Sequence, residues 1–383
     1  MNRDKIVLIS KDAMGNFYLP TYGNSYWKTP NIEELASKGT VFRRHYTAAP
    51  STSMSCLAMF AGIYPYQTNI RDYRPLKEEF KDTLFADLSK KGYDCHILWE
   101  ASWNDGFVKY SNVWSHTTFD WLEGMEQHVG GKFKHERPIL PDKNKAEKAI
   151  RGFESKLESI LDSGNQKKFI WVHFPHVLAG SCGYGADIEL FDQCVGIVRN
   201  YVSDDCIYIT ADHGNMNGLK GKICYGFDVY EPAIRIPLIT PRINGLEEYT
   251  GVTSNVDLRE IILNSNIVKR DFAISDSAYY AQPERKMAIV GERYKYIYNK
   301  QDGSEELYDV LFDVNENINI INMDFWDVDR NIMYPLEEVY WYPYWDESRE
   351  ALEKFRNEKN KIWRESSIQE KIYYKIMNML KIN

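Results

Sequence analysis

The sequence has few of the features that mark secreted, nucleic-acid-binding or membrane-spanning proteins. Its six cysteines are scattered and form no C-x-x-C pair, which is typical of free thiols in a reducing compartment. Positive charge is not in excess: the formal net charge is −8, and this argues against nucleic acid as the main partner. The polar residues 1–5 lead directly into an apolar run, so neither a signal peptide nor a transmembrane span is expected. We therefore expect a cytoplasmic protein.

What the chain does have is enough apolar material for a large core. It contains 383 residues, of which 44% are hydrophobic and 14% aromatic. A chain of this length and composition is expected to form one large domain, or one large domain and a smaller one.

Three apolar runs each end at residues that can bind a metal ion. The segments Ile6–Ser10, Phe169–His176 and Cys206–Gly214 read as buried parallel strands that end in ligand-type residues, and the carboxyl ends of parallel strands gather at one edge of a sheet. An adjacent carboxylate and imidazole suit a divalent cation. A single Asp-His-Gly also occurs in ordinary turns, and an aspartate after a strand can simply cap the next turn. Three such strand ends together favour a metal site. The candidate residues are Asp12, His176, Asp212 and His213.

A further candidate is Thr52, in the stretch 49–65. The turn-forming Pro50 and Ser51 precede hydroxyl residues and an apolar segment that ends at Gly62, which predicts a helix starting near Ser53. The free N–H groups and the dipole at such a helix N-terminus favour an anion. The Thr52 hydroxyl can cap the helix, or it can attack a phosphorus or sulfur centre when a metal ion lowers its pKa. The candidate metal ligands elsewhere in the chain favour the second interpretation.

These segments, taken in order, resemble the sulfatase branch of the alkaline phosphatase superfamily over roughly the first 320 residues. Residues 29–42 are close to the family's long T-P-N-hydrophobic-x-x-L-A-x-x-G-x-x-F signature, and residues 230–239 resemble its Y-E-x-x-I-R-V-P-L-I strand. Asp12 falls at the end of the family's first metal-binding strand, and His176 matches its P-H element. The further matches are Thr52 at the nucleophile position, residues 62–65, the D-H-G of residues 212–214, and residues 294–297 and 306–309.

The resemblance implies an α/β fold with a large mixed, mostly parallel sheet sandwiched by helices, and a smaller C-terminal α+β subdomain. It places the catalytic domain in residues 1–265 and the small subdomain in residues 266–325. Residues 326–383 would then form an aromatic and helical C-terminal extension.

The departures from the family pattern bear on the chemistry. A true sulfatase carries C-x-P-S-R or S-x-P-S-R, whose first residue is oxidised to formylglycine. Here residues 52–56 read Thr-Ser-Met-Ser-Cys, and Thr cannot give that aldehyde. Lys11 also replaces the family's second N-terminal aspartate. The phosphoethanolamine and phosphoglycerol transferases of the superfamily use a Thr nucleophile, and the surroundings of Thr52 resemble theirs.

The resemblance therefore implies a metal-dependent phosphotransferase. It would move a phosphoethanolamine- or phosphoglycerol-type group from a phosphodiester donor to a glycan or lipid-linked acceptor, through a covalent Thr52 intermediate. By analogy, the pathway would be surface polysaccharide biosynthesis. The alternatives are a phosphodiesterase or phosphonate monoester hydrolase with the same site, a sulfatase-like hydrolase, and an inactive binding member that has lost its metal.

The resemblance also assigns a role to each site residue. Asp12, Asp212 and His213, with the Thr52 oxygen, would hold one divalent ion, Mn²⁺ or Zn²⁺ in preference to Ca²⁺ or Mg²⁺. His176 would protonate the leaving group or bind the phosphate, and a second metal at His176 is left open. The further candidates for substrate contact are Ser55 and Lys222, whereas His173 is expected to be structural.

The C-terminal extension lies outside the resemblance. Residues 334–345 are rich in aromatics, which would pack on the body of the protein or stack on a glycan. Ser348 to Arg364 is predicted to be a charged helix. Residues 366–383 carry an apolar stripe at helical spacing beside three lysines, which suits either a peripheral contact with an anionic membrane or docking onto the protein or a partner subunit, as in a homo-oligomer.

Overall fold

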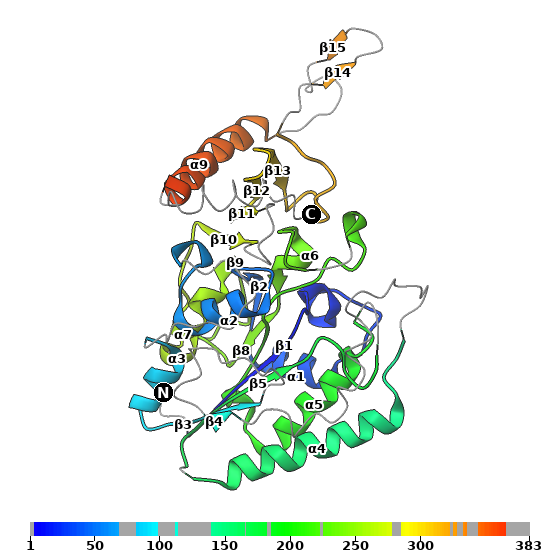
Figure 1. Cartoon of the computed structure of the whole chain (residues 1–383), viewed down its shortest axis with the longest axis vertical. Coiled ribbons are helices and arrows are strands. Elements are labelled where there is room, and N and C mark those ends of the chain that lie inside the picture. Colours follow the sequence, from blue (N-terminus) through cyan, green and yellow to red (C-terminus); the bar gives the residue numbers. More distant parts are fainter. Residues whose placement is uncertain are drawn as a thin grey trace, which may run out of the picture.

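The computed structural model is built around one large sheet with helices on both faces (Figure 1). It describes residues 4–68, 82–98, 112–113, 139–164, 166–181, 185–222, 225–277, 285–321, 325–327, 332–334 and 344–364. The nine strands of this sheet follow the order β4-β3-β5-β1-β6-β8-β2-β7, with β9 beside β2. They are β1 (Lys5–Lys11), β2 (Thr40–Tyr46), β3 (Asp94–Leu98), β4 (Asn112–Val113), β5 (Lys168–Phe174), β6 (Ile207–Ala211), β7 (Arg235–Ile236), β8 (Leu238–Thr240) and β9 (Glu248–Ser254).

The centre of the sheet is parallel, and one side of it is mixed, with antiparallel pairs at β8 and β7 and a parallel pair between β2 and β9. β3, β5, β1 and β6 run parallel to their neighbours in this group, whereas β8 pairs antiparallel with both β6 and β2. The sheet is therefore mixed and mostly parallel around β1, as the sequence predicts. The central strands are covered on both faces, which explains why they are continuous apolar runs without alternation.

The two faces of the sheet carry separate hydrophobic cores. Val7 and Ile9 of β1 pack with one set of helices, and the alternate residues Ile6 and Leu8 pack with the other. The first set is α1 (Pro30–Lys38), α4 (Lys143–Asp162) and α5 (Ile188–Tyr201), and the second is α2 (Thr52–Ala61), α3 (Leu84–Lys90) and α7 (Leu258–Asn264). The two sets lie on opposite sides of the sheet in Figure 1.

A second, smaller sheet follows in the chain and is antiparallel. Its strands are β10 (Phe272–Asp276), β11 (Lys286–Gly291), β12 (Tyr294–Asn299) and β13 (Glu305–Asp309). α9 (Trp345–Arg364) packs on it, with Leu352 and Phe355 against Ile289 and Tyr296. β14 (Phe325–Asp327) and β15 (Ile332–Tyr334) form a separate antiparallel pair. This arrangement confirms the predicted α/β fold class with a smaller α+β part, whereas the domain boundaries stay predictions.

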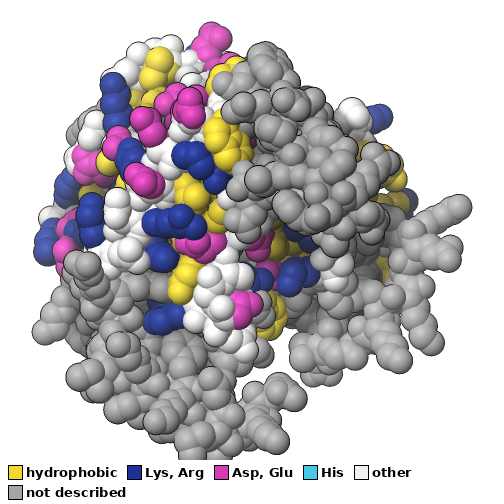
Figure 2. Space-filling model, turned by 90° about the horizontal axis from the view of Figure 1, so that it is seen from above, with side chains coloured by type: hydrophobic (Ala, Val, Ile, Leu, Met, Phe, Trp, Pro, Cys, Tyr) yellow, Lys and Arg dark blue, Asp and Glu magenta, His cyan; other side chains and the backbone are white. Residues whose placement is uncertain are grey.

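The face seen from above the small sheet is mixed in charge. Acidic and basic side chains are interspersed with small hydrophobic areas over its described part (Figure 2). No helix in the described part of the chain combines the length and the apolar character needed to cross a membrane. Residues 366–383 and most of the aromatic stretch 334–345 lie outside the described residues, and the predictions made for them stay predictions.

The register of three neighbouring strands positions the candidate site. Lys11, the last residue of β1, pairs with Phe174 of β5 on one side and with Ala211 of β6 on the other. The residues that follow these three positions therefore leave the sheet at the same edge. The short helix α6 (Glu231–Ile234) and the N-terminus of α2 complete the surroundings.

Candidate metal centre

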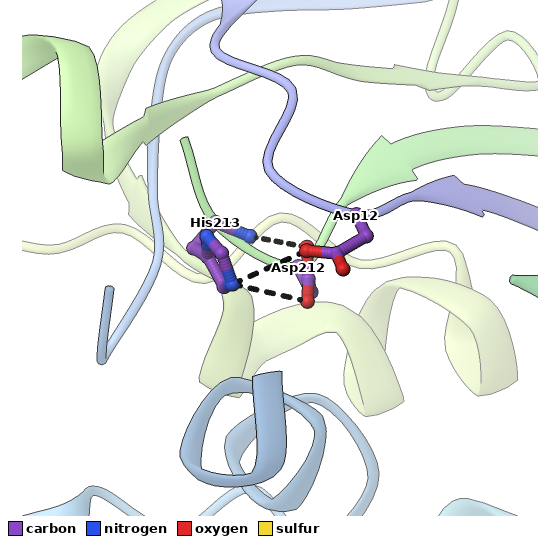
Figure 3. A group of neighbouring side chains, drawn as sticks. All are labelled: Asp12, Asp212 and His213. Atoms are coloured by element: carbon purple, nitrogen blue, oxygen red, sulfur yellow. Dashed lines mark hydrogen bonds and ion pairs between the residues drawn. The ribbon is translucent and has the colours of Figure 1, made fainter. Parts of the chain in front are cut away.

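Asp12, Asp212 and His213 converge at this edge of the sheet. One ligand atom from each lies within 4.8 Å of the others. The His213 Nε2 atom lies 3.4 Å from Asp12 Oδ1 and 3.5 Å from Asp212 Oδ2 (Figure 3). The aspartates follow β1 and β6, so the parallel register brings together residues that are 200 positions apart in the chain.

A backbone hydrogen bond orients the His213 ring so that its Nε2 atom lies toward the two carboxylates. Nδ1 lies 2.8 Å from the Gly214 carbonyl oxygen, which can only accept, so Nδ1 carries the proton and Nε2 offers a lone pair. The N–H of Gly214 donates to the carbonyl oxygen of Ala233 at 2.8 Å, which brings this backbone close to α6. A glycine is required at this position because a Cβ atom would overlap the carbonyl oxygen of Pro232. The glycine of the Asp-His-Gly sequence therefore allows a close backbone approach to α6.

The two carboxylates are largely buried and only partly satisfied. Asp212 Oδ1 accepts hydrogen bonds from the N–H groups of Ala13 at 3.1 Å and His213 at 2.8 Å. Within the described residues, no hydrogen bond reaches Asp212 Oδ2 or Asp12 Oδ1, although both atoms are buried. Burial, reinforced by the charge of Asp212, raises the pKa of Asp12 to about 7. Burial likewise raises the pKa of Asp212 to about 7, against the lowering effect of the His213 and Ala13 backbone N–H groups and of the Thr52 side chain.

This donor set fits a divalent cation. Two carboxylate oxygens without hydrogen bonds and one imidazole lone pair face a common point, where a cation would offset the cost of burying both charges. Oxygen and nitrogen ligands together suit Mn²⁺ or Zn²⁺. The prediction of one divalent ion agrees with this geometry, whereas the choice of metal and a second ion stay predictions.

Thr52 borders the same point. It is the first residue of α2, is only 3% exposed, and its Oγ1 atom lies 3.2 Å from His213 Nε2. Ser51, and not Thr52, occupies the N-cap position, and no side-chain hydrogen bond caps the helix. The structure thus does not use Thr52 as a cap, and its hydroxyl is placed among the candidate ligands.

Ser55 joins α2 to the end of β6. Its Oγ donates to the carbonyl oxygen of Asp212 at 2.5 Å and accepts from Asn255 Nδ2 at 2.8 Å. The Asn255 side chain also accepts from the N–H of Ala48 at 2.9 Å. Ser55 therefore fixes the position of α2, which carries Thr52, relative to Asp212. A direct contact between Ser55 and substrate stays a prediction.

His176 lies at the same rim, and Lys11 anchors the turn that carries it. The His176 Nε2 atom is 3.4 Å from Asn215 Nδ2. The buried Lys11 ammonium lies 2.9 Å from Asp187 Oδ2 and donates to the carbonyl oxygens of Pro175 at 3.1 Å and His176 at 3.0 Å. Lys11 stands where the family pattern has an aspartate. Its ammonium binds this turn and Asp187, and it forms no ion pair with the described metal-ligand candidates.

Lys222 forms an ion pair with a carboxylate. Its Nζ atom lies 3.0 Å from Asp228 Oδ2, and the other oxygen of Asp228 contacts Lys286. The Lys222 side chain remains 38% exposed. A contact between Lys222 and a phosphate stays a prediction.

Other residues at the site were not predicted from the sequence to take part in it. Tyr225 packs its ring 4.5 Å from the ring of His213, and His173 Nε2 lies 3.8 Å from Asp212 Oδ2. The sequence feature that could have pointed to His173 is its position as a polar residue inside an apolar strand. Asn215 follows the Asp-His pair closely in the sequence, whereas Tyr225 and Asn255 come from segments with no distinctive pattern.

The sequence of the N-terminal part matches a known family. Residues 4–177 match the family described as Sulfatase. Human N-acetylgalactosamine-6-sulfatase is 28% identical over 149 residues, which cover 36% of this chain and 28% of that enzyme. The chain spans less than a third of the length of this relative and of human arylsulfatases D and H.

The fold is also that of solved members of this group. The structure of a 2-O GAG sulfatase has a TM-score of 0.66 with 16% identity, and the match covers 94% of this chain and 93% of that one. The phosphonate monoester hydrolase of Agrobacterium radiobacter has a TM-score of 0.61 with 15% identity, over 94% of this chain and 96% of that one. At these identities the similarity shows a shared fold and leaves the substrate open.

Proposed function

Because the sequence match and the fold are those of the sulfatase-like branch of the alkaline phosphatase superfamily, we propose that this protein is a metal-dependent enzyme acting on phosphodiesters through Thr52. It transfers a phospho-alcohol group, of the phosphoethanolamine or phosphoglycerol type, to a hydroxyl of a glycan or lipid-linked acceptor. The observation that carries this proposal is the position of the Thr52 hydroxyl, 3.2 Å from His213 Nε2 and beside two carboxylates that lack a counter-charge among the described residues.

Asp12, Asp212 and His213 would hold the divalent ion that this family generally uses, with Thr52 Oγ1 beside it. When bound, the ion supplies Lewis-acid polarisation of the phosphoryl group and favours the Thr52 alkoxide. Asp212 is oriented by two backbone N–H groups and His213 by the Gly214 carbonyl, so the protein fixes both ligands before the substrate arrives.

The reaction divides into two displacements at phosphorus. In the first, Thr52 Oγ1, having lost its proton, forms a bond to phosphorus, and the bond from phosphorus to the donor alcohol breaks. The departing oxygen takes up a proton, for which His176 is the candidate donor. In the second, the acceptor hydroxyl gives its proton to His176, which the first step left neutral, and its oxygen attacks phosphorus. The bond from phosphorus to Oγ1 breaks and leaves Oγ1 as the alkoxide that began the first step. The N–H groups at the start of α2 offer hydrogen bonds to the charge on the phosphoryl oxygens.

Hydrolysis by water in the second step is the second candidate function. It is favoured by the fold that the chain shares with the phosphonate monoester hydrolase of Agrobacterium radiobacter. The two functions share the same first step and the same covalent intermediate. They differ in whether an alcohol or water resolves phospho-Thr52.

The test is mass spectrometry of the protein after incubation with Mn²⁺ and a panel of phosphodiesters and phosphonate monoesters. We expect an adduct on Thr52 whose mass equals the transferred group, and we expect Thr52→Ala to remove the adduct and to lower turnover by about 10³-fold or more. Ser53→Ala is the matched control, because it removes the neighbouring buried hydroxyl of the same helix. Turnover and adduct formation that survive Thr52→Ala would contradict the proposed nucleophile, whatever the control shows.

Product analysis separates the two candidate functions. In the presence of an added alcohol or oligosaccharide, a transferase produces the phosphorylated acceptor in place of the free phosphomonoester. A hydrolase produces the same monoester with or without the acceptor. Transfer of oxygen from labelled water into the product would therefore support the second candidate.

A further inference from the structure

A chain of buried polar groups lies directly behind Asp212. Ser10 of β1 and His173 of β5 are paired in register on neighbouring strands, and Trp171 lies two residues before His173 on the same side of β5. Trp171 Nε1 is 2.8 Å from Ser10 Oγ, which is 2.7 Å from His173 Nδ1. His173 Nε2 in turn lies 3.8 Å from Asp212 Oδ2. The groups therefore follow one another toward a candidate metal ligand.

The indole group sets the direction of the hydrogen bonds in this chain. A Trp N–H can only donate, so Ser10 Oγ accepts from Trp171 and has one proton left to donate. Two acceptors are within reach of that proton, His173 Nδ1 at 2.7 Å and the Val172 carbonyl oxygen at 3.5 Å. The shorter contact is the stronger hydrogen bond. Ser10 therefore donates to His173 Nδ1, and the single proton of the neutral imidazole is on Nε2.

This assignment gives the two imidazoles beside Asp212 opposite tautomers. His213 carries its proton on Nδ1 and turns the lone pair of Nε2 toward the two carboxylates. His173 carries its proton on Nε2, the atom nearest to Asp212 Oδ2. With that proton in place His173 has no lone pair to give to a metal ion, whereas its N–H attracts the carboxylate oxygen that no described residue hydrogen-bonds.

We propose that His173, fixed in its tautomer by Ser10 and Trp171, is a positioning residue for the metal ligand Asp212. Its N–H restricts the rotation of the carboxylate, so that Oδ2 is aimed at the metal before the ion binds. Outer partners of this kind commonly change metal affinity by about 10–100-fold. This proposal rests on the metal centre of the proposed function and extends it to residues of the sheet interior.

Equilibrium binding of Mn²⁺ to the full chain, without substrate, tests the proposal. His173→Leu removes the N–H, and we expect the affinity for Mn²⁺ to fall by about 10–100-fold. His173→Gln places an amide N–H near the position of Nε2, and we expect it to restore affinity to within a few-fold of the wild type. Ser10→Ala, which frees the imidazole to take the other tautomer, should give an intermediate loss. Ser10→Ala also keeps the proposal testable if His173→Leu does not fold.

The matched control is His96→Gln. His96 is a second buried imidazole, on the neighbouring strand β3, and its Nε2 lies 2.9 Å from Asp94 Oδ2 rather than from a candidate ligand. It should leave the affinity for Mn²⁺ unchanged, and thermal unfolding of all variants separates stability from binding. Wild-type affinity in folded His173→Leu and Ser10→Ala would overturn this proposal alone. Failure of the wild type to bind Mn²⁺ or Zn²⁺ would overturn the metal centre, and with it both proposals.

Discussion

Two buried clusters of carboxylates in this protein are built in opposite ways. In the first, Asp12 and Asp212 face each other beside an imidazole lone pair, and no described Lys or Arg forms an ion pair with either. In the second, Glu231 and Glu316 share the buried ammonium of Lys295, at 3.2 Å and 2.7 Å. The second cluster is compensated from within the chain, whereas the first is left for a cation from outside.

The second cluster also explains how the two sheets are joined. Lys295 is in β12 of the small sheet, and Glu231 is in α6, just before β7 of the large sheet. Arg235 and Tyr46 add further contacts to Glu231, at 3.5 Å and 3.3 Å. Although burial acts to raise the pKa of Glu231, the charges of Lys295, Arg235 and Arg44 together hold that pKa below its usual range. A lysine shared by both carboxylates thus marks the structural cluster, although burial raises the pKa of Glu316 to about 7, whereas the described residues supply no Lys or Arg ion pair to the candidate site.

The largest expected effect comes from breaking the internally paired cluster. Lys295→Met leaves Glu316 without its cation and Glu231 with only the more distant Arg235, and we expect the free energy of unfolding to fall by about 3–5 kcal/mol. Chemical denaturation measures this loss. The affinity for Mn²⁺ of the protein that remains folded should be unchanged, because no candidate ligand is altered. A stability equal to that of the wild type would contradict the structural role assigned to Lys295.

The second change is made in the Asp12–Asp212 cluster, which has no Lys or Arg ion pair among the described residues, and removes one of its carboxylates. Asp212→Asn should lower the affinity for Mn²⁺ by more than about 100-fold, beyond the usual effect of an outer partner. Because an unpaired buried charge is lost, the metal-free variant should be at least as stable as the metal-free wild type. Calorimetric binding and thermal unfolding check the two parts. Asp94→Asn, which removes a carboxylate away from the site, is the control, and a metal-free Asp212→Asn that is clearly less stable would argue against an uncompensated charge.

The same cluster makes metal binding depend on pH. The pKa values of Asp12 and Asp212 are raised from 3.8 to about 7 in the folded, metal-free protein, so this state holds more protons than the unfolded chain between those values. Their contribution to stability is therefore complete below about pH 4 and is lost as the pH rises through about 7. Metal binding must displace these protons, so the affinity for Mn²⁺ should fall below pH 7, by up to about tenfold per pH unit for each proton.

Binding isotherms between about pH 5.5 and 8 measure this dependence. The Asp12→Asn variant should show a weaker slope, because one of the two titrating groups is gone. An affinity that stays constant across this range would contradict the raised pKa values.

The smallest expected effect concerns Lys222, which is paired with a carboxylate but, unlike Lys295, is partly exposed to solvent. Its ion pair with Asp228 is partly exposed, so Lys222→Met should change the free energy of unfolding by no more than about 1 kcal/mol. If Lys222 binds phosphate, the variant raises KM for phosphodiesters while thermal stability stays the same. Steady-state kinetics decide this, and an unchanged KM would remove Lys222 from the substrate site.

Much of the fold could be read from local patterns. The helix after Thr29 begins with Pro30 and ends before Gly39, and α2 ends before Gly62, which adopts the left-handed conformation with φ of 68°. Apolar runs predicted the central strands to within one to three residues at each end. The side of the sheet around β8 and β2 could not be read in the same way, because the pairing of short strands depends on contacts between distant segments.

The convergence of the candidate metal ligands could be predicted from the sequence, whereas the residues that support them could be predicted less well. Asp12 and the Asp212–His213 pair follow strands with strong apolar patterns, so the edge of the sheet where they meet could be inferred. The partners of Lys11 could not be inferred, since Asp187 comes from the segment before α5. The closeness of His173 to Asp212 could not be inferred either, because it depends on the register of β5 with β1 and of β1 with β6.

The sequence by itself determined the kinds of residue that end each strand and the presence of Thr52 at a helix N-terminus, because capping, turns and apolar runs are local properties. With Thr52 at the nucleophile position that the resemblance implies, the identity of this one residue also argues against the formylglycine route. Only the tertiary structure decided which carboxylates lack a counter-charge. Burial and pairing arise when strands 200 residues apart align, and an aspartate in the sequence looks the same whether a lysine, a backbone N–H or a metal ion will face it.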